Sequence, residues 1–234
     1  MPFLLSFYPD FMTIQERYDK VLEWFRGNMP IAQSELNYSN PFELLVAVVL
    51  SAQCTDKRVN MVTPALFKAY PTAKEMAKAS QHAIYEYIKS ISYPNNKAAH
   101  LHRLAQKLQQ DFEGQVPSDM QLLQKLPGVG RKTASVVMAV AFDKPAMPVD
   151  THVFRVAHRL HLVGKSATTP LAVEKKLTRY IPKAEWGVAH HWLLLHGRYV
   201  CTARHPQCGS CGLSEVCPSK RLKPHRSSIN YLNN

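Results

Sequence analysis

Helical periodicity runs through nearly the whole chain and constrains its fold more than any other feature. Apolar residues recur three and four positions apart from Thr13 onward, as in Ile14, Tyr18 and Val21, and no segment shows the sustained alternation of a strand. The sequence therefore predicts an all-α protein. Besides a buried helix at 44–50, we expect helices at 56–69, 72–79, 81–89, 95–112, 118–126, 131–142, 151–160, 170–180 and 184–195.

The most apolar of these helices is too short to cross a membrane. Its apolar run covers 44–50, whereas a membrane span needs about 20 apolar residues. Asn40 as N-cap, Pro41 as first helical residue and Glu43 as a capping-box acid mark its start. The opening ten residues lack the basic start and cleavage site of a secretory signal, and Met12 could be the natural start. We therefore expect no membrane span and a cytoplasmic protein.

The chain is strongly basic. Lysine and arginine number 29 against 17 aspartates and glutamates, which gives a formal net charge of +12. Such a surface attracts polyanions. A basic chain can also be merely soluble or bind an anionic membrane, and charge alone does not separate these cases. Nucleic acid is the first candidate partner.

A glycine-rich segment at 126–133, LPGVGRKT, separates two helical patterns. Gly128 and Gly130 permit a tight turn with outward-facing backbone amides, and the following helix adds its positive N-terminal end, so the turn suits a phosphate. The spacing matches neither the nucleotide-binding P-loop nor the dinucleotide fingerprint. We interpret this segment as a helix-hairpin-helix that grips a DNA backbone.

Lys132 falls in the first turn of the helix that follows this hairpin. Its positive charge there opposes the helix macrodipole at a cost of about 0.3–1 kcal/mol, which favours the neutral, nucleophilic amine. A lone lysine beside a glycine turn can equally be a surface residue that touches phosphate. Further along, Asp150 has the position of an N-cap, with Thr151 and His152 in the first turn after it. Taken singly, these residues fit structural roles as well as catalytic ones.

Four cysteines fall within residues 201–217: Cys201, Cys208, Cys211 and Cys217, separated by six, two and five residues. Four thiolates in so short a loop can close around one metal centre. A basic chain without an export signal disfavours disulfides, and the spacing leaves zinc and an iron–sulfur cluster open. Cys54 is isolated from this group, and we expect it to be a small core residue.

Together these segments resemble the endonuclease III family, bifunctional DNA glycosylases of the helix-hairpin-helix superfamily. The resemblance rests on LPGVGRKT, the VDTH segment after it, the four-cysteine loop, and LSAQ at 50–53 followed by Asp56, and it covers about 12–217. It implies a [4Fe–4S] cluster on the four cysteines. It also implies two helical lobes with the active site between them. A six-helix barrel with the hairpin would cover 34–144, an iron–sulfur domain 12–33 and 145–217, and a disordered basic tail 218–234.

The resemblance further implies the site residues. Lys132 would attack C1′ of a flipped-out nucleotide that carries an oxidised pyrimidine, while Asp150 would stabilise positive charge on the sugar and assist proton transfers. β-Elimination from the resulting Schiff base would cut the strand on the 3′ side. Gln53 would fill the hole in the duplex. The other implied DNA-binding residues are Tyr93, Gly128, Gly130, Arg131, Thr151 and His152.

The segment that would wedge the opposite strand departs from the family pattern. Ser92, Tyr93 and Pro94 stand where the family carries a glycine, a large apolar residue and an aromatic. Tyr93 can stack on any base, although an ordinary loop tyrosine is an equal interpretation.

The implied partner is double-stranded DNA with damaged pyrimidines or abasic sites, bound by a monomer at the bacterial nucleoid. Two alternatives remain. Mismatch adenine glycosylases share the hairpin, the aspartate and the cluster, but they usually lack a lysine at 132 and carry an extra C-terminal domain, for which we expect no room after Cys217. A non-catalytic, metal-stapled DNA-binding module is the other. For the cluster itself two roles are open: it would staple a basic loop bearing Arg198, Arg204 and His205 against phosphate, or it would change oxidation state when DNA binds, and we favour the structural role.

Overall fold

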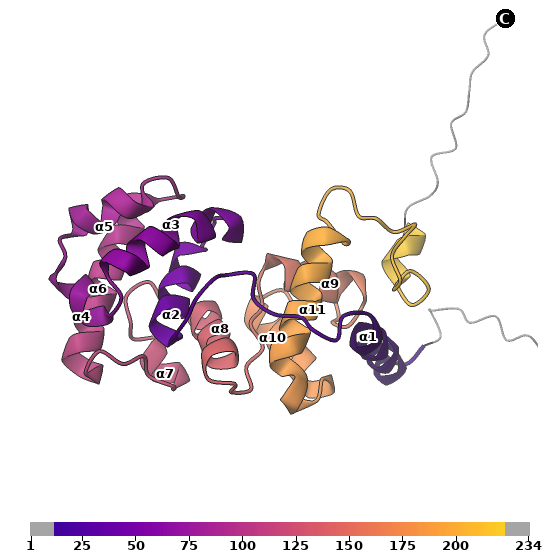
Figure 1. Cartoon of the computed structure of the whole chain (residues 1–234). Helices are drawn as coiled ribbons and strands as arrows, with labels where there is room; N and C mark the ends of the chain where they lie inside the picture. The colour runs from indigo at the N-terminus through magenta and orange to yellow at the C-terminus, as the bar shows by residue number, and fades with distance from the viewer. Residues whose placement is uncertain (1–11, 223–234) are drawn as a thin grey trace, which may run out of the picture. The chain divides into compact units, whose positions relative to one another are not determined.

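The computed structural model describes residues 12–222, and its regular elements are all helical (Figure 1). No β-strand occurs in this range, which confirms the all-α prediction. The predictions for the first eleven residues and for most of the basic tail lie outside the described residues. Within the described range no helix is both long and apolar enough to cross a membrane.

The helices follow the sequence pattern closely. Within the described residues they are α1 (Ile14–Asn28), α2 (Pro41–Leu50), α3 (Asp56–Ala69), α4 (Ala73–Lys78), α5 (Gln81–Ile88), α6 (Pro94–Phe112), α7 (Met120–Leu123), α8 (Arg131–Ala141), α9 (Thr151–Arg159), α10 (Pro170–Tyr180) and α11 (Trp186–Tyr199). The clearest departure is α7, which is shorter than the predicted 118–126. It ends early because Lys125 and Leu126 donate backbone hydrogen bonds three residues back, into a tight turn.

Side-chain caps fix several helix starts. At α1, Thr13 and Glu16 form a full capping box, in which the Glu16 carboxylate accepts from the Thr13 N–H at 2.8 Å. At α2, Asn40 accepts from the Glu43 N–H at 3.0 Å, but Glu43 accepts from Ser39 rather than from the N-cap itself. The capping-box prediction is therefore wrong in its second half. In contrast, α6 and α8 begin without a side-chain cap.

Backbone contacts divide the chain into two compact units. Of the described residues, the first unit contains 12–31, 149–181 and 192–222, and the second contains 32–148 and 182–191. The predicted barrel and iron–sulfur domains stay predictions. They differ from this division chiefly at residues 182–191, which the sequence assigned to the iron–sulfur domain.

The second unit has α2 as its core. Residues 44–50 are all buried, and α2 packs against α3, α6 and α8 (Figure 1). Because burying one leucine or valine side chain contributes about 1.5–3 kcal/mol, this short helix anchors the unit. Cys54 is half-buried and packs against the same core, in agreement with its predicted role.

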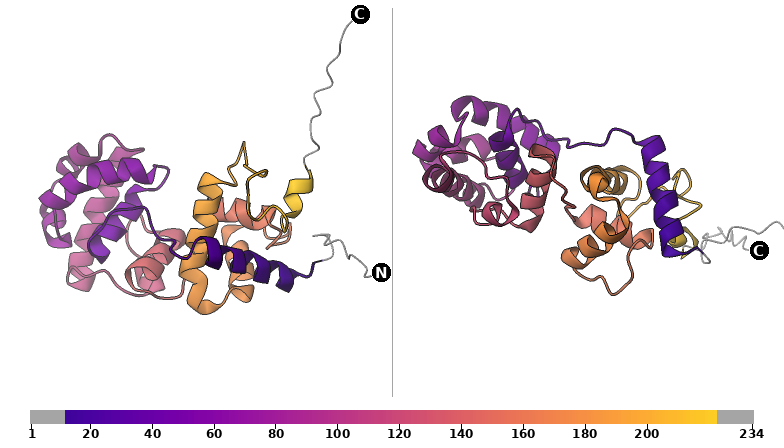
Figure 2. Two further views of the ribbon diagram at one scale, coloured as in Figure 1. Left: turned by 45° about the vertical axis from the view of Figure 1, so that its right-hand side comes forward. Right: turned by 90° about the horizontal axis from the view of Figure 1, so that it is seen from below.

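In the first unit, α1 joins segments from distant parts of the sequence. Phe25 stacks on Trp192 with 5.7 Å between ring centroids, and the Trp192 indole donates to the carbonyl of Met29 at 2.7 Å. Arg17 donates to the carbonyl of Val216 at 3.1 Å. Figure 2 shows α1, in indigo, beside the yellow C-terminal loop. This helix therefore supports the four-cysteine loop directly.

Candidate functional site: a glycine hairpin, a capping aspartate and a four-cysteine loop

The glycine hairpin lies between α7 and α8, as predicted. The Val129 N–H donates to the carbonyl of Leu126 at 3.1 Å and closes the turn. Gly128 has a φ of +78°, in the region that favours glycine. A Cβ at this position would lie 3.1 Å from the Cβ of His100. Gly128 is therefore required both by backbone conformation and by close packing.

Replacing Gly128 with alanine should destabilise the protein by about 1–3 kcal/mol, because the backbone would be strained and the new methyl group would press on His100. Gly27→Ala is the matched control. Gly27 lies inside α1 with nothing within 4 Å of a built Cβ, so alanine there should stabilise by about 0.5–1 kcal/mol. Urea denaturation measures both changes. An unaltered midpoint for Gly128→Ala would contradict the stated need for glycine.

Lys132 is the exposed second residue of α8. The N-cap of this helix is Gly130, which offers no side chain, so the start of α8 has no side-chain cap and its first-turn amides suit an anion. His191, in the same unit, lies near enough to feel the lysine charge. Burial lowers the pKa of His191 and the charge of Lys132 lowers it further, while a hydrogen bond to the carbonyl of Gly187 opposes both. No sequence pattern indicated that a buried histidine lies within electrostatic range of Lys132.

Asp150 caps α9 in the first unit. Its Oδ1 accepts from the N–H groups of His152 and Val153, both at 2.8 Å. Within the described residues these are its only hydrogen bonds, so Oδ2 remains available to a ligand. The N-cap interpretation is confirmed. A catalytic role can coexist with it because the two roles use different oxygens.

Arg155 ties α9 to the start of the cysteine loop. Its guanidinium donates to the carbonyls of Gly197 and Cys201, at 2.7 and 3.1 Å. It also lies 3.1 Å from Nδ1 of His152. Because arginine can only donate, this nitrogen of His152 accepts and Nε2 carries the ring proton. His152 can therefore offer an N–H to a phosphate from a ring that Arg155 orients.

Gln53 and Tyr93 share an uncommon backbone conformation. Their φ angles are +52° and +55°, in the left-handed region that few non-glycine residues adopt. Both side chains are exposed, Tyr93 by 62%. Gln53 lies in the turn after α2, and Tyr93 is the N-cap of α6. Both belong to the second unit, and the strain they share was not visible in the sequence.

The four loop cysteines are half-buried and unpaired, so no disulfide forms among the described residues. In the described range, no group of three or more cysteine, histidine or acidic side chains is close enough together to hold a metal ion. The choice between zinc and an iron–sulfur cluster therefore rests on the comparisons below. Burial raises the pKa of the Cys211 and Cys217 thiols, and the neighbouring loop thiols raise it further. A cation close to these sulfurs would favour their thiolate forms.

Two nitrogen-bearing side chains, those of Arg159 and His196, lie within hydrogen-bonding distance of loop sulfurs. Arg159 donates to Sγ of Cys201 at 3.4 Å, and Nε2 of His196 lies 3.7 Å from Sγ of Cys211. Burial lowers the pKa of His196 to about 4, and its Nδ1 is buried without a hydrogen-bond partner in the described structure. A neutral ring with its proton on Nε2 fits both facts. Such donors suit sulfurs that carry negative charge, as cluster ligands do.

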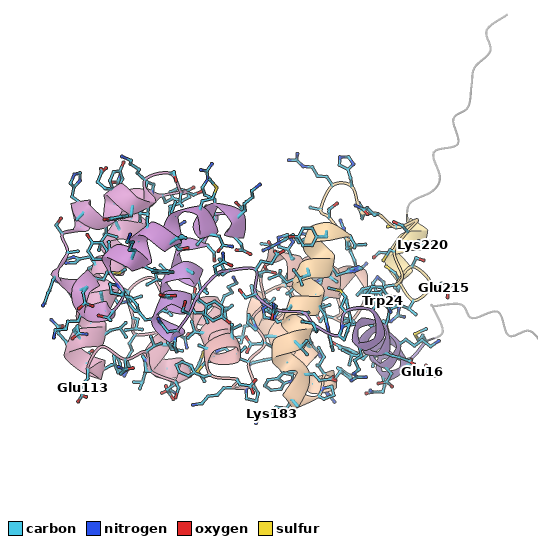
Figure 3. All side chains as sticks on the ribbon, in the orientation of Figure 1. Glu16, Trp24, Glu113, Lys183, Glu215 and Lys220 are labelled. Carbon is cyan, nitrogen blue, oxygen red and sulfur yellow. The ribbon has the colours of Figure 1, made fainter. Side chains whose placement is uncertain are left out.

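Trp24 of α1, labelled in Figure 3, closes one side of the loop. A Cβ at Gly212 would lie 2.4 Å from the Trp24 indole nitrogen, so only glycine fits beneath this ring. The loop residues Arg204 and His205 are exposed. The loop is thus packed on one side and open to solvent at its basic residues.

These features define a helix-hairpin-helix protein with a four-cysteine metal loop. The family model described as "HhH-GPD superfamily base excision DNA repair protein" matches residues 46–183, which is more than half of the chain. A second, described as "Iron-sulfur binding domain of endonuclease III", matches residues 201–217. The cofactor is therefore a [4Fe–4S] cluster, as the resemblance implied.

Comparison with curated relatives identifies the family within this class of helix-hairpin-helix proteins. Endonuclease III of Rickettsia conorii is 46% identical over 199 residues, covering 85% of this chain and 94% of the relative. Endonuclease III of Bacillus subtilis is 47% identical over 199 residues, which cover 85% of this chain and 89% of the relative. Endonuclease III of Escherichia coli K12 is 45% identical over 203 residues, which cover 86% of this chain and 94% of the relative. The chain belongs to the endonuclease III family.

Solved structures agree. A trapped endonuclease III–DNA covalent intermediate matches with a TM-score of 0.86 and 44% identity, covering 91% of this chain and 100% of that chain. A non-covalent endonuclease III–DNA complex gives the same values. A thermostable thymine-DNA glycosylase has a TM-score of 0.79 at 23% identity, which shows a shared fold.

Proposed function

We propose that this chain removes oxidised pyrimidines from duplex DNA and then cuts the strand, with Lys132 as the nucleophile. Membership in the endonuclease III family makes it a base excision repair glycosylase and AP lyase. The observation that carries the assignment of Lys132 is its position in the first turn of α8, directly after the glycine hairpin.

DNA binding begins at the phosphates. The Gly128 and Gly130 turn presents backbone amides at the uncapped start of α8, with Arg131 beside them. In the first unit the start of α9 offers Thr151 and the oriented ring of His152. Such contacts fix the register of the protein on the duplex and carry no base identity, and the net charge of +12 favours them.

Base extrusion follows. The damaged nucleotide rotates out of the stack, at a cost that is smallest where pairing is already weakened. Gln53 occupies the space that the base leaves, and Tyr93 stacks against the opposite strand. Their exposed positions in one unit support this assignment.

The chemistry uses one amine and one carboxylate. The neutral amine of Lys132 attacks C1′, so that a nitrogen–carbon bond forms while the bond to the base breaks, and the base departs with the bonding electrons and a proton. Oδ2 of Asp150 stabilises the positive charge that develops on the sugar. After ring opening, the iminium acidifies the C2′ proton, and its loss expels the 3′ phosphate. Hydrolysis of the iminium then frees Lys132.

The cluster supplies structure. Cys201, Cys208, Cys211 and Cys217 would hold the cluster, which would there cross-link a loop that has little regular secondary structure of its own. Arg159 and His196 hold two of the sulfurs, and Arg155 connects the same loop to the helix that Asp150 caps. The chain acts as a monomer in the bacterial cytoplasm, where the chromosome lies; the curated relatives described above are all bacterial.

Borohydride trapping on a duplex with one abasic site tests the proposal. Reduction of the Schiff base should leave one chain covalently attached to DNA, and without borohydride the strand should be cut on the 3′ side. A non-catalytic DNA-binding module would give neither product. A mismatch adenine glycosylase would excise adenine from mismatches without an adduct, so either result would overturn the assignment.

A further inference from the structure

Lys97 is a buried lysine near the start of α6 that none of the steps above uses. Only 5% of it is exposed, and its ammonium donates to the carbonyls of Leu50 and Ala52, at 2.8 and 2.7 Å. Burial lowers the pKa of Lys97. A buried ammonium is costly unless it is hydrogen-bonded, so this group is retained against a desolvation cost.

Both acceptors belong to the turn that carries Gln53. Leu50 ends α2, a helix with no basic residue in its last turn, and its carbonyl lies where the macrodipole favours a cation. Ala52 directly precedes Gln53. Hydrogen bonding of the Ala52 carbonyl fixes the peptide plane from which the φ of Gln53 is measured. Lys97 is therefore bonded to the peptide that leads directly into the left-handed Gln53.

The same residue is bonded to the turn that carries Tyr93. The backbone N–H of Lys97 donates to the carbonyl of Tyr93 at 3.1 Å, which forms the first turn of α6. This helix start has neither a side-chain cap nor an acid in its first turn. One residue thus joins two strained, exposed turns, to Gln53 through its side chain and to Tyr93 through its backbone.

We propose that Lys97 is a positioning residue that holds the Gln53 and Tyr93 turns in a fixed relation, so that both side chains enter the duplex together. The proposal rests on the insertion roles proposed above. A turn that is already ordered loses less conformational freedom on binding than one that must be ordered by DNA. Lys97 should therefore strengthen binding where the base stack must open, and leave binding to intact duplex unchanged.

Lys97→Met tests this, because methionine keeps the apolar stem and removes the donors. Lys144→Met is the matched control: the ammonium of Lys144 donates to the carbonyl of Ser118, so the control loses the same charge and a similar bond in the same unit. Fluorescence anisotropy gives the Kd for a duplex with a tetrahydrofuran abasic analogue and for the undamaged duplex at one salt concentration. We expect the preference for the abasic duplex to fall about tenfold in Lys97→Met and to stay at its wild-type value in Lys144→Met.

A double-mutant cycle separates positioning from general loss of stability. In a Gln53→Ala background, Lys97→Met should lower the preference for the abasic duplex by less than about twofold, because the side chain that Lys97 positions is already absent. The proposal is overturned if Lys97→Met lowers the preference for the abasic duplex about tenfold in both backgrounds, or if it leaves that preference unchanged in the wild-type background. An unchanged preference in Gln53→Ala and Tyr93→Ala instead overturns the insertion roles. If the methionine variant does not fold, Lys97→Gln replaces it in the cycle. Its amide is uncharged and its side chain is one atom shorter, so it should weaken both bonds, and we expect a smaller fall in preference in the wild-type background and none in Gln53→Ala.

Discussion

Replacing Lys132 with alanine should abolish covalent trapping and lower strand cleavage by about 10³-fold or more, since no other group in the mechanism supplies the amine. Binding to the abasic duplex should change far less, because the hairpin amides remain. Borohydride trapping and gel analysis of the cut strand measure the two effects on one substrate.

Lys125→Ala is the control for this variant. Lys125 is an exposed lysine just before the hairpin, so its removal causes the same charge loss without touching a proposed site residue. The Lys125→Ala variant should give the same yield of covalently trapped DNA adduct as the wild type. An adduct of wild-type yield from Lys132→Ala would place the nucleophile elsewhere. An equal loss in Lys125→Ala would mean that charge near the hairpin, and not the Lys132 amine, is what matters.

Asp150→Asn should lower base excision by about 10²–10⁴-fold while leaving the unfolding midpoint near the wild-type value. Asparagine is as good an N-cap as aspartate, and its side-chain oxygen can accept the same two N–H bonds of α9. The negative charge on Oδ2 is lost. Single-turnover excision and thermal denaturation therefore separate the catalytic role from the capping role.

Asp119→Asn provides the matched control. Asp119 caps α7 in the same way, accepting from the N–H groups of Gln121 and Leu122 at 2.8 and 2.9 Å. This substitution should leave both excision and stability unchanged. If Asp150→Asn excised the base as fast as the wild type, Asp150 would be an N-cap without a catalytic role. If its unfolding midpoint fell, the loss of activity would be explained by destabilisation of α9.

Local signals explain what the sequence could predict. Helix periodicity and N-caps depend on residues a few positions apart, so α1–α6 and α8–α10 appear close to where the pattern indicates. The glycine hairpin and the capping role of Asp150 are local in the same sense. The early end of α7 was missed because two backbone bonds of a tight turn compete with the last helical turn, and no side chain marks that competition.

Long-range contacts explain what the sequence could not predict. Lys97 reaches carbonyls 45 and 47 residues away, and Arg155 reaches a carbonyl 46 residues away. In the sequence both are ordinary basic residues within amphipathic helices, and nothing at fixed spacing identifies them. The pairing of His196 with Cys211 and the left-handed φ of Gln53 and Tyr93 likewise arise only from packing.

The way α1 closes the first unit has a consequence for how the protein is made. Arg17 is bonded to a residue 199 positions later, and Trp24 covers Gly212 of the cysteine loop. The ribosome therefore produces α1 long before its binding partners. Docking of α1 must wait for those partners, whereas most of the second unit is synthesised in the interval and can fold within it. Until then the apolar face of α1 has no partner to pack against.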